Sequence, residues 1–420
     1  MRHKSRYKVF QKLTLVSVLI GFLAAFLAVS LKRITEHYED IFFLKANQLN
    51  FLYFLFPLFG LTIIYFLRKY MFKNKENKGI KEIFECTESS NKNLPVYKIP
   101  SHFINGFFTV IFGGSTGIEV STVVSSATIG SVAQQKANFL QEYKTELICA
   151  GIAAGITALF SSPIAGILFA VEVISRKVNR TLLFTNLIAV FVASLLVYIL
   201  DEPTLFLIKV NTWNFHAIPY FMILGVLAGL NSVFLTKSVL YFKSQFVKIE
   251  KNQNKVLVGT IIIGCAILLL PILYGDSYHG IKEILAEPNT VFSLKFFLSI
   301  FGILLLKPII TAITLASGGD GGVFAPSLVI GAFLGFFVAT FLNTFFNANV
   351  LPINFIIIGM AALLSASIHA PFTSLFLVCS IVNDYTLFIP ILLVCLISKY
   401  TAKYIFPHTV YSYSLNPIKA

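Results

Sequence analysis

Apolar segments make up most of this chain, and many of them are too short or too interrupted to cross a bilayer as ordinary helices. Long apolar helices are expected near 12–33, 49–68, 181–200, 217–242, 256–274, 293–316 and 388–406. Shorter segments broken by Gly, Pro or Ser lie near 78–86, 102–112, 119–137, 145–160, 163–174, 280–287, 324–346, 354–367 and 370–384. Broken helices persist at membrane depth only where protein or a water-filled cavity covers their free backbone groups. The pattern therefore predicts an all-α polytopic membrane protein with an internal site.

The distribution of charge supports this interpretation. Of the 420 residues, 12% are charged, against roughly a quarter in soluble domains. The net charge of +14 comes from basic residues in the N-terminal tail and near 68–81, 176–180 and 237–255, whereas 35–40 and 201–203 are expected to be acidic connecting segments. By the positive-inside rule, we expect a multi-pass membrane protein with both termini cytoplasmic. The charge then reports topology and not nucleic-acid binding.

Two smaller features complete this topology. Met1–Lys12 and the apolar run Leu13–Leu31 have the order of a signal peptide, but the run is long and lacks an obvious cleavage site, so we interpret it as the first membrane helix. The five cysteines show no CxxC or metal-ligand spacing. We therefore expect buried thiols, and neither a metal site nor a cofactor.

Three motifs recur in the same order in the two halves of the chain. The separations between their copies are 201, 205 and 208 residues, which are nearly constant, for Lys78–Ile83 against His279–Ile284, Gly113–Gly130 against Gly318–Gly335, and Gly151–Pro163 against Gly359–Pro371. We infer two structural repeats, about 10–200 and 215–410, within a single transmembrane domain spanning 1–420. The basic loops indicate that the second repeat starts from the opposite face, so the repeats are inverted. No C-terminal regulatory domain is expected after Tyr411.

The stretch Gly113–Ser131 places one carboxylate, Glu119, after a glycine-rich turn and at the start of an otherwise apolar helix. An ionisable residue in such surroundings is costly to bury and indicates function. The helix N-terminus supplies free backbone N–H groups and the positive end of the helix dipole, which together form an anion site. Because Glu119 is itself an anion, we expect its carboxylate to fill that site until protonation or a soluble anion displaces it.

The repeat mate of this stretch, Gly318–Gly322, precedes a helix expected to begin near Phe324. Its glycines allow a tight turn that would point the backbone N–H groups of Val323 and Phe324 at an anion. A glycine-rich connector between closely packed helices is the alternative interpretation. An inverted two-fold would bring the helix starting near Glu119 toward the one starting near Phe324, close to the midplane.

Together these residues resemble the CLC family of chloride channels and proton-coupled chloride antiporters over essentially the whole chain. The match is carried by Gly322–Pro326 on the family's GxFxP element, Gly117-Ile118-Glu119 on its G-x-E-G-P element, Pro163–Glu172 on its next helix, and Tyr411 on a pore-facing C-terminal tyrosine. The resemblance implies a homodimer with one anion path per subunit and Glu119 as the external gate. It also implies anion binding by Gly117, Ile118, Gly322, Val323, Phe324, Tyr411 and, at the position of a family serine, Lys78.

Three departures from the family pattern concern the mechanism. Lys78 either attracts anions or is one more lysine of a cytoplasmic loop. Val120-Ser121 follows Glu119 where the family has Gly-Pro. Val173 stands where the family's antiporters often carry a second, inner glutamate for protons. Its neighbour Glu172 is expected to be paired at the inner boundary, near Arg176, more than to carry protons. If the protein exchanges protons, water or Glu172 is the substitute inner route.

A chloride channel gated by Glu119 is our main interpretation of these residues. A chloride/proton antiporter and a fluoride-selective transporter, which also alters the sequence after its gating glutamate, are the alternatives within transport. Among other classes, an intramembrane enzyme is disfavoured because no HExxH, GxSxG or P-loop motif occurs. A scaffold would gain nothing from broken helices. The partners are then a small monovalent anion, protons in the antiporter case, lipid, and a second copy that contacts the apolar faces of Leu182–Leu200 and Leu387–Ile397.

Overall fold

The computed structural model describes residues 2–75, 77–89, 92–137, 142–206, 208, 210, 212–288 and 293–413, with side chains from Lys8 onward. Its helices are α1 (Arg2–Gln48), α2 (Leu52–Phe66), α3 (Ile80–Glu88), α4 (Lys98–Ile111), α5 (Glu119–Lys136), α6 (Lys144–Phe160), α7 (Pro163–Phe169), α8 (Arg180–Ile199), α9 (Ile218–Val247), α10 (Asn252–Leu269), α11 (Tyr278–Ala286), α12 (Leu294–Ala316), α13 (Phe324–Phe346), α14 (Pro352–Ile368), α15 (Pro371–Ile381) and α16 (Phe388–Ile405). π-Helical turns η1 (Leu67–Met71) and η3 (Ala170–Ser175) extend α2 and α7. The chain ends expected in the cytoplasm, Met1 and Ala420, lie outside the described residues.

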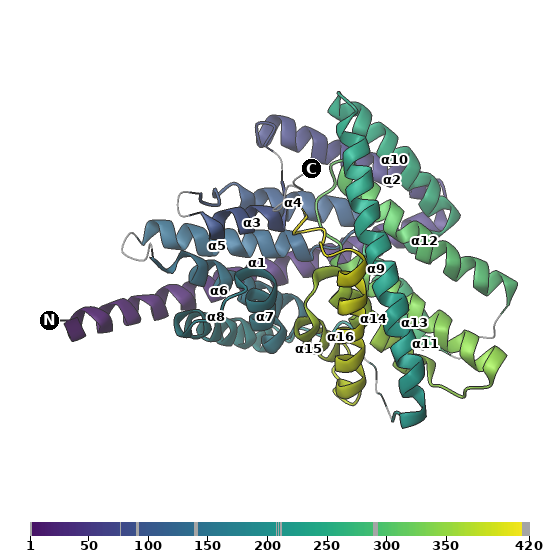
Figure 1. Ribbon diagram of the computed structural model, residues 1–420. Coiled ribbons are helices and arrows are strands. Elements are labelled where there is room, and N and C mark those ends of the chain that lie inside the picture. Colours follow the sequence, from purple (N-terminus) through teal and green to yellow (C-terminus); the bar gives the residue numbers. More distant parts are fainter. Residues whose placement is uncertain are drawn as a thin grey trace.

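Helices in the first half of the chain pack on one another in the same pattern as their mates in the second half (Figure 1). The long helix α1 packs on α4, α6 and α8, and the long helix α9 packs on α12, α14 and α16. The pairs α5–α6 and α13–α14 likewise correspond, as do α6–α7 and α14–α15. This correspondence confirms the predicted all-α fold of two repeats.

The centre of the molecule consists of α5, α6, α13 and α14, which are buried along most of their length. Small residues let these helices approach closely. A Cβ at Gly130 would collide with the carbonyl oxygen of Leu147, and a Cβ at the repeat mate Gly335 would collide with that of Phe355. Glycine at these two helix crossings therefore allows the close packing that positions α5 and α13 within the core.

The outer helices have the length and composition of membrane spans. Eight helices among the described residues are long and apolar enough to cross a bilayer. Their outward faces carry large apolar side chains, including Phe26 on α1, Phe191 on α8 and Phe301 on α12. Burying such faces in lipid is favourable, and the polytopic membrane architecture predicted from the sequence is confirmed.

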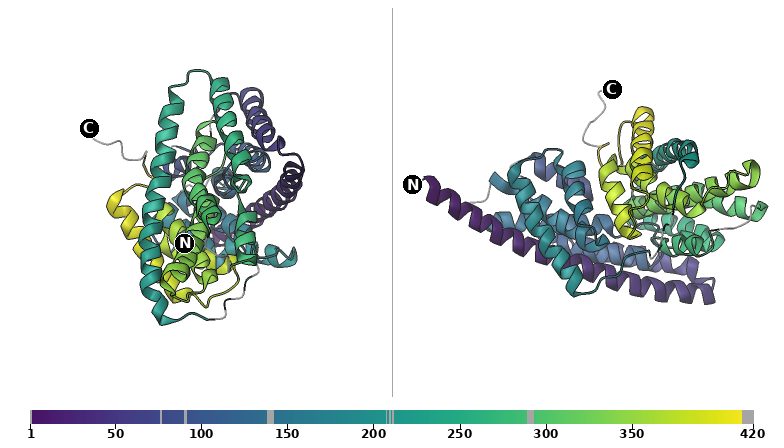
Figure 2. Two further views of the ribbon diagram at one scale, coloured as in Figure 1. Left: turned by 90° about the vertical axis from the view of Figure 1, so that its right-hand side faces the viewer. Right: turned by 90° about the horizontal axis from the view of Figure 1, so that it is seen from below.

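The prediction that Thr35–Asp40 forms an acidic connecting segment is wrong, because α1 continues through it to Gln48. The chain has no Gly or Pro between Gly21 and Pro57 to end the helix. The acidic side chains have partners that make this continuation possible. Glu39 is buried and its Oε1 accepts a hydrogen bond from the backbone N–H of Asp276 at 3.0 Å. Two further views show α1 running along one side of the molecule (Figure 2).

Candidate functional site

The two glycine-rich turns that precede α5 and α13 meet each other in the core. Gly117 and Gly322 form an antiparallel backbone bridge. Two reciprocal contacts flank it, since Thr314 Oγ1 accepts from the backbone N–H of Ser115 at 3.2 Å and Thr109 Oγ1 accepts from that of Asp320 at 2.9 Å. Thr109 and Thr314 are repeat mates, so each repeat supports the turn of the other. The inverted repeats therefore place the N-termini of α5 and α13 side by side.

Glu119, the first residue of α5, lies at this meeting point and is 2% exposed. Its Oε1 accepts a hydrogen bond from the Tyr278 hydroxyl at 2.8 Å. The backbone N–H groups of Glu119 itself and of Ala325, in the first turn of α13, face the carboxylate. Its Oε2 makes no hydrogen bond of ordinary geometry with the described residues and lies against Gly117. The carboxylate thus sits at the positive end of α13, where a free anion would be stabilised.

On one side of Glu119 lies a cavity of about 190 Å³, here named the basic cavity. Its lining includes Asn77, Lys78, Gly79, Lys81, Val120, Lys243, Asp320, Gly322, Val323 and Tyr411. Val120 and Tyr411 lie close to Gly322, since a Cβ on Gly322 would collide with the Val120 side chain and stand 3.2 Å from the Tyr411 hydroxyl. That hydroxyl is buried and has no hydrogen-bond partner of ordinary geometry among the described residues. It is therefore available to a group in the cavity.

On the other side lies a cleft of about 140 Å³, here named the acidic cleft. Its lining includes Lys32, Glu36, Glu39, Asp40, Asp276, Tyr278, His279 and Lys282. Tyr278 connects the cleft to the site, because it lines the cleft and donates to Glu119. Behind it, Lys307 on α12 is completely buried and donates to the carbonyl oxygen of Gly275 at 3.1 Å and to Ser277 Oγ at 2.5 Å. Glu119 therefore lies between an acidic cleft and a basic cavity.

The remaining predicted residues occupy different places around this centre. Ile118 and Val323 are buried beside the bridge, and the Phe324 side chain packs against Phe160 and Phe169. Val323 lines the basic cavity. Lys78 is exposed and lines the basic cavity, with its own N–H donated to Glu82 at 2.5 Å.

The expected pairing of Glu172 with Arg176 is wrong. Glu172 lies in η3, and its Oε2 accepts from the backbone N–H and the hydroxyl of Thr373 at 2.9 and 2.8 Å. The free backbone donors at the start of α15 attract the carboxylate more specifically than a flexible arginine does. Arg176 lies over the ring of Phe84 at 5.0 Å. The neighbouring Val173 is buried.

Three residues near the site were not predicted from the sequence: Tyr278, Lys307 and His102. Tyr278 directly precedes the repeated HGIKEI motif, and Lys307 interrupts an apolar helix, so both carried a visible signal. His102 on α4 pairs with Asp320, with 3.0 Å between its Nδ1 and Oδ1 of the carboxylate. Lys307 and His102 are 205 residues apart, which makes them repeat mates in a buried position of α12 and α4.

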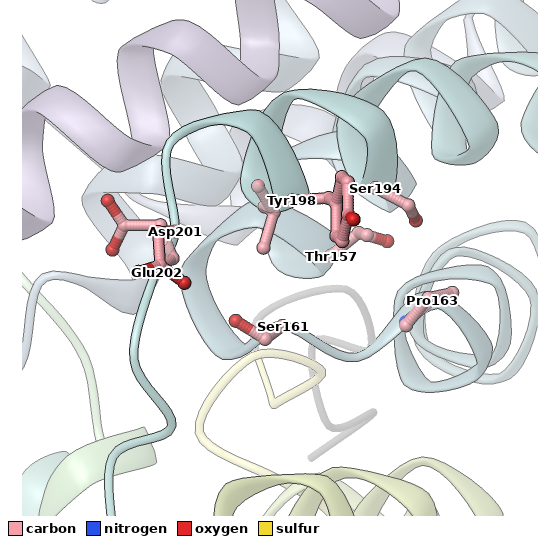
Figure 3. A pocket seen from close by; sticks show the side chains of 8 residues that line it. Thr157, Ser161, Pro163, Ser194, Tyr198, Asp201 and Glu202 are labelled. Carbon is pink, nitrogen blue, oxygen red and sulfur yellow. The ribbon is translucent and has the colours of Figure 1, made fainter.

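A separate cavity of about 260 Å³ lies where α6, α7 and α8 meet (Figure 3). Thr157, Ser161, Ser194 and Tyr198 line it together with Asp201 and Glu202. None of the predicted site residues contributes to it, and Glu202 is already paired with Arg33 and Lys32. The candidate site is therefore the region around Glu119 and not this cavity.

Known proteins resemble this chain along most of its length. Residues 59–403 match the family model described as voltage gated chloride channel. The H(+)/Cl(-) exchange transporter ClcA of Vibrio cholerae is 26% identical over 428 residues, covering 99% of this chain and 90% of that protein. The voltage-gated ClC-type chloride channel ClcB of Escherichia coli is 28% identical over 307 residues, covering 72% of each chain.

Solved structures share the fold. The crystal structure of a CLC-type fluoride/proton antiporter superposes with a TM-score of 0.80 at 22% identity, covering 96% of this chain and 98% of that one. A slow cyanobacterial Cl-/H+ antiporter superposes with a TM-score of 0.82 at 20% identity, covering 96% and 97%. With the family model matching most of its length, this chain belongs to the voltage-gated chloride channel (CLC) family of anion-transporting membrane proteins.

Proposed function

We propose that the protein exchanges chloride for protons, with Glu119 as the gate that binds both in turn. The observation that carries this proposal is the position of the Glu119 carboxylate, which faces the N-terminus of α13 between the acidic cleft and the basic cavity. Exchange replaces the channel interpretation as the main one, because the relative that covers nearly the whole chain is an H(+)/Cl(-) exchange transporter and the solved structures of similar fold include two proton antiporters.

In this proposal the ionised carboxylate and the transported anion compete for the same helix N-terminus. While Glu119 is ionised, it occupies the backbone donors at the start of α13 and blocks the path. Protonation from the acidic cleft removes its charge, so that an anion entering from the basic cavity can take its place beside Tyr411. The anion then leaves through the acidic cleft and the proton leaves Glu119 toward the basic cavity, so that the ionised carboxylate occupies the site again.

The positive-inside rule sets the direction we propose for this cycle. Lys78, Lys81 and Lys243 line the basic cavity, and loops rich in lysine face the cytoplasm in multi-pass proteins. The basic cavity would then open to the cytoplasm of a bacterial cell and the acidic cleft to the outside. In intact cells, a lysine-reactive label added from outside should modify Lys282 in the acidic cleft and not Lys78. Modification of Lys78 but not of Lys282 contradicts this orientation.

Reconstituted flux tests the proposed exchange directly. Purified protein in liposomes loaded with chloride is diluted into low-chloride buffer, and chloride and pH are recorded together with a potassium ionophore to set the voltage. We expect chloride outflow to drive protons in the opposite direction. Chloride outflow without proton movement would support the channel alternative. Fluoride and nitrate in parallel vesicles identify which monovalent anion the site prefers.

We expect Tyr278→Phe to weaken the binding of the Glu119 carboxylate at its site, while Glu119 still acts as the gate. The Tyr278 hydroxyl donates to the carboxylate in a buried setting. A hydrogen bond to a charged group contributes roughly 1.5–3 kcal/mol, so its loss shifts the equilibrium toward the displaced carboxylate about tenfold or more. Anion flux measured at alkaline pH, where Glu119 is ionised, should rise, while proton coupling remains. A flux unchanged across the whole pH range contradicts this role, and Tyr65→Phe, remote on α2, is the control.

We further propose a homodimer that buries the outward faces of α8 and α16 with α7 and α15. Leu187, Phe191 and Leu195 form an exposed apolar stripe on α8, and Ile389 and Leu393 form one on α16. With the exposed Cys265 replaced by Ser, a short bifunctional maleimide should link Phe191→Cys protomers in native membranes. Leu298→Cys on the outward face of α12, which is also exposed, should stay unlinked. A Phe191→Cys protein that remains monomeric in membranes and nanodiscs contradicts the dimer.

A further inference from the structure

We propose that the His102–Asp320 pair is the inner proton acceptor, taking protons from Glu119 and releasing them into the basic cavity. This inference rests on the proposed exchange function. It answers a question the sequence raises, because Val173 cannot carry a proton and Glu172 is held by the N-terminus of α15. A coupled exchanger needs a protonatable group on the basic-cavity side, and the structure offers this pair.

The pair is buried and fixed on all sides except one. His102 is completely buried on α4, and its Nδ1 lies 3.0 Å from Asp320 Oδ1. The second carboxylate oxygen accepts from Asn77 Nδ2 at 2.5 Å, and the backbone N–H of Asp320 donates to Thr109. His102 Nε2 has no hydrogen-bond partner among the described residues. One basic nitrogen is therefore held in a defined direction with nothing bound to it.

This geometry assigns the protons. Because the Asp320 carboxylate accepts hydrogen bonds, Nδ1 carries the hydrogen and Nε2 carries the lone pair. A proton arriving at Nε2 forms the imidazolium, whose charge the adjacent carboxylate stabilises. Loss of the same proton from Nε2 restores the neutral ring. Each cycle thus moves one proton through Nε2 and leaves the Nδ1–Asp320 hydrogen bond intact.

Asp320 places the pair next to the basic cavity and next to the turn that precedes Glu119. Asp320 and Asn77 line the basic cavity together with Gly322 and Tyr411. Asp320 lies two residues before Gly322 in the sequence. Gly322 forms the backbone bridge with Gly117, which lies two residues before Glu119. The His102–Asp320 pair therefore lies beside the turn that precedes Glu119, and Asp320 lines the same basic cavity that is proposed to admit the anion.

Charged side chains from three neighbouring elements surround the pair. Arg68 from η1 acts electrostatically on Asp320, and Lys98 from α4 reaches Asn77 Oδ1 at 3.3 Å. Glu82 from α3 accepts from Lys98 at 2.7 Å and offsets part of that charge. The Asp320 carboxylate is thus shared between the His102 ring and nearby cations, and His102 is not its only positively charged neighbour when protonated.

His102→Gln tests the proposal because glutamine keeps the size and polarity of the ring but does not titrate. In the chloride-driven liposome assay, we expect proton movement per chloride to fall at least about tenfold, the range that a positioned acid–base group contributes. Chloride flux should persist and keep its dependence on pH at the acidic cleft, since Glu119 is untouched. His369→Gln, which removes a partly buried histidine that lines neither the acidic cleft nor the basic cavity, is the matched control and should keep wild-type coupling. Glu172→Gln should also keep it.

Asp320→Asn provides a second test, in which the pH dependence of coupled transport is measured. In planar bilayers with separate baths, this variant should move the midpoint of coupled transport to lower pH in the basic-cavity bath alone, because the imidazolium loses its counter-charge. Wild-type coupling in His102→Gln, equal losses in His102→Gln and His369→Gln, or an unmoved midpoint in Asp320→Asn would each overturn the inference while leaving the exchange function intact. A wild-type protein that moves no protons overturns both.

Discussion

Glu119→Gln is expected to abolish proton coupling completely and to make anion flux independent of pH on both sides of the membrane. Glutamine has the shape of a protonated glutamate but never ionises, so the helix N-terminus of α13 stays free for anions at every pH. Chloride and proton movement recorded together in liposomes, at several pH values, measure both consequences.

The control for this variant is Glu172→Gln. Glu172 lies in the same half of the chain as Glu119, and its carboxylate accepts hydrogen bonds at the start of α15. That variant should keep wild-type coupling and pH dependence. If Glu119→Gln protein still moves protons in fixed proportion to chloride, the gate lies elsewhere and the proposed exchange mechanism does not hold.

Lys307→Met should destabilise the protein by about 3–5 kcal/mol, since it removes the cation from a buried cluster of carboxylates. Lys307 is 0% exposed, and the charges of Asp276, Glu39 and Glu119 act on it. Without the ammonium group, the carbonyl oxygen of Gly275 and Ser277 Oγ also lose their donor. Thermal unfolding in detergent, followed by loss of the monodisperse peak on gel filtration, measures the effect.

Two further variants separate charge balance from packing at this position. Lys282→Met removes an exposed lysine from the same cleft and should change stability by less than about 0.5 kcal/mol. The double variant Lys307→Met/Glu39→Gln should recover part of the loss, because one buried carboxylate no longer needs a counter-charge. A double variant less stable than Lys307→Met alone would show that Lys307 acts mainly by filling space.

Much of the fold could be predicted from the sequence because apolar periodicity and internal repetition are properties of the chain itself. The helix expected at 324–346 is α13 with the same ends, since Gly322 and Asn347 mark both of its boundaries. The repeated glycine motifs likewise correspond to matching turns, because the same backbone conformation requires glycine in both copies. The extent of α1 could not be predicted, because its acidic residues find partners from the second repeat.

The same limit applies to the site. Glu119 was predicted because a lone carboxylate in an apolar segment is conspicuous in one dimension. Tyr278 and His102 were not, because their importance comes from the residues they touch, Glu119 and Asp320, which are 159 and 218 positions away. Glu172 was assigned the wrong partner for this reason: Arg176 is near in sequence, whereas the α15 N-terminus is near in space. Contacts between the repeats carry the information that sequence patterns lack.

The bridge between Gly117 and Gly322 also has a consequence for biosynthesis. Its two residues lie 205 positions apart, so the first repeat is synthesised well before the turn that completes the site exists. During that interval Glu119 lacks both the N-terminus of α13 and the hydroxyl of Tyr278. A carboxylate in that state belongs in water or must be protonated. The nascent first repeat therefore has to keep Glu119 within reach of the aqueous phase until the second repeat enters the membrane, and insertion of α13 is the step that seals it.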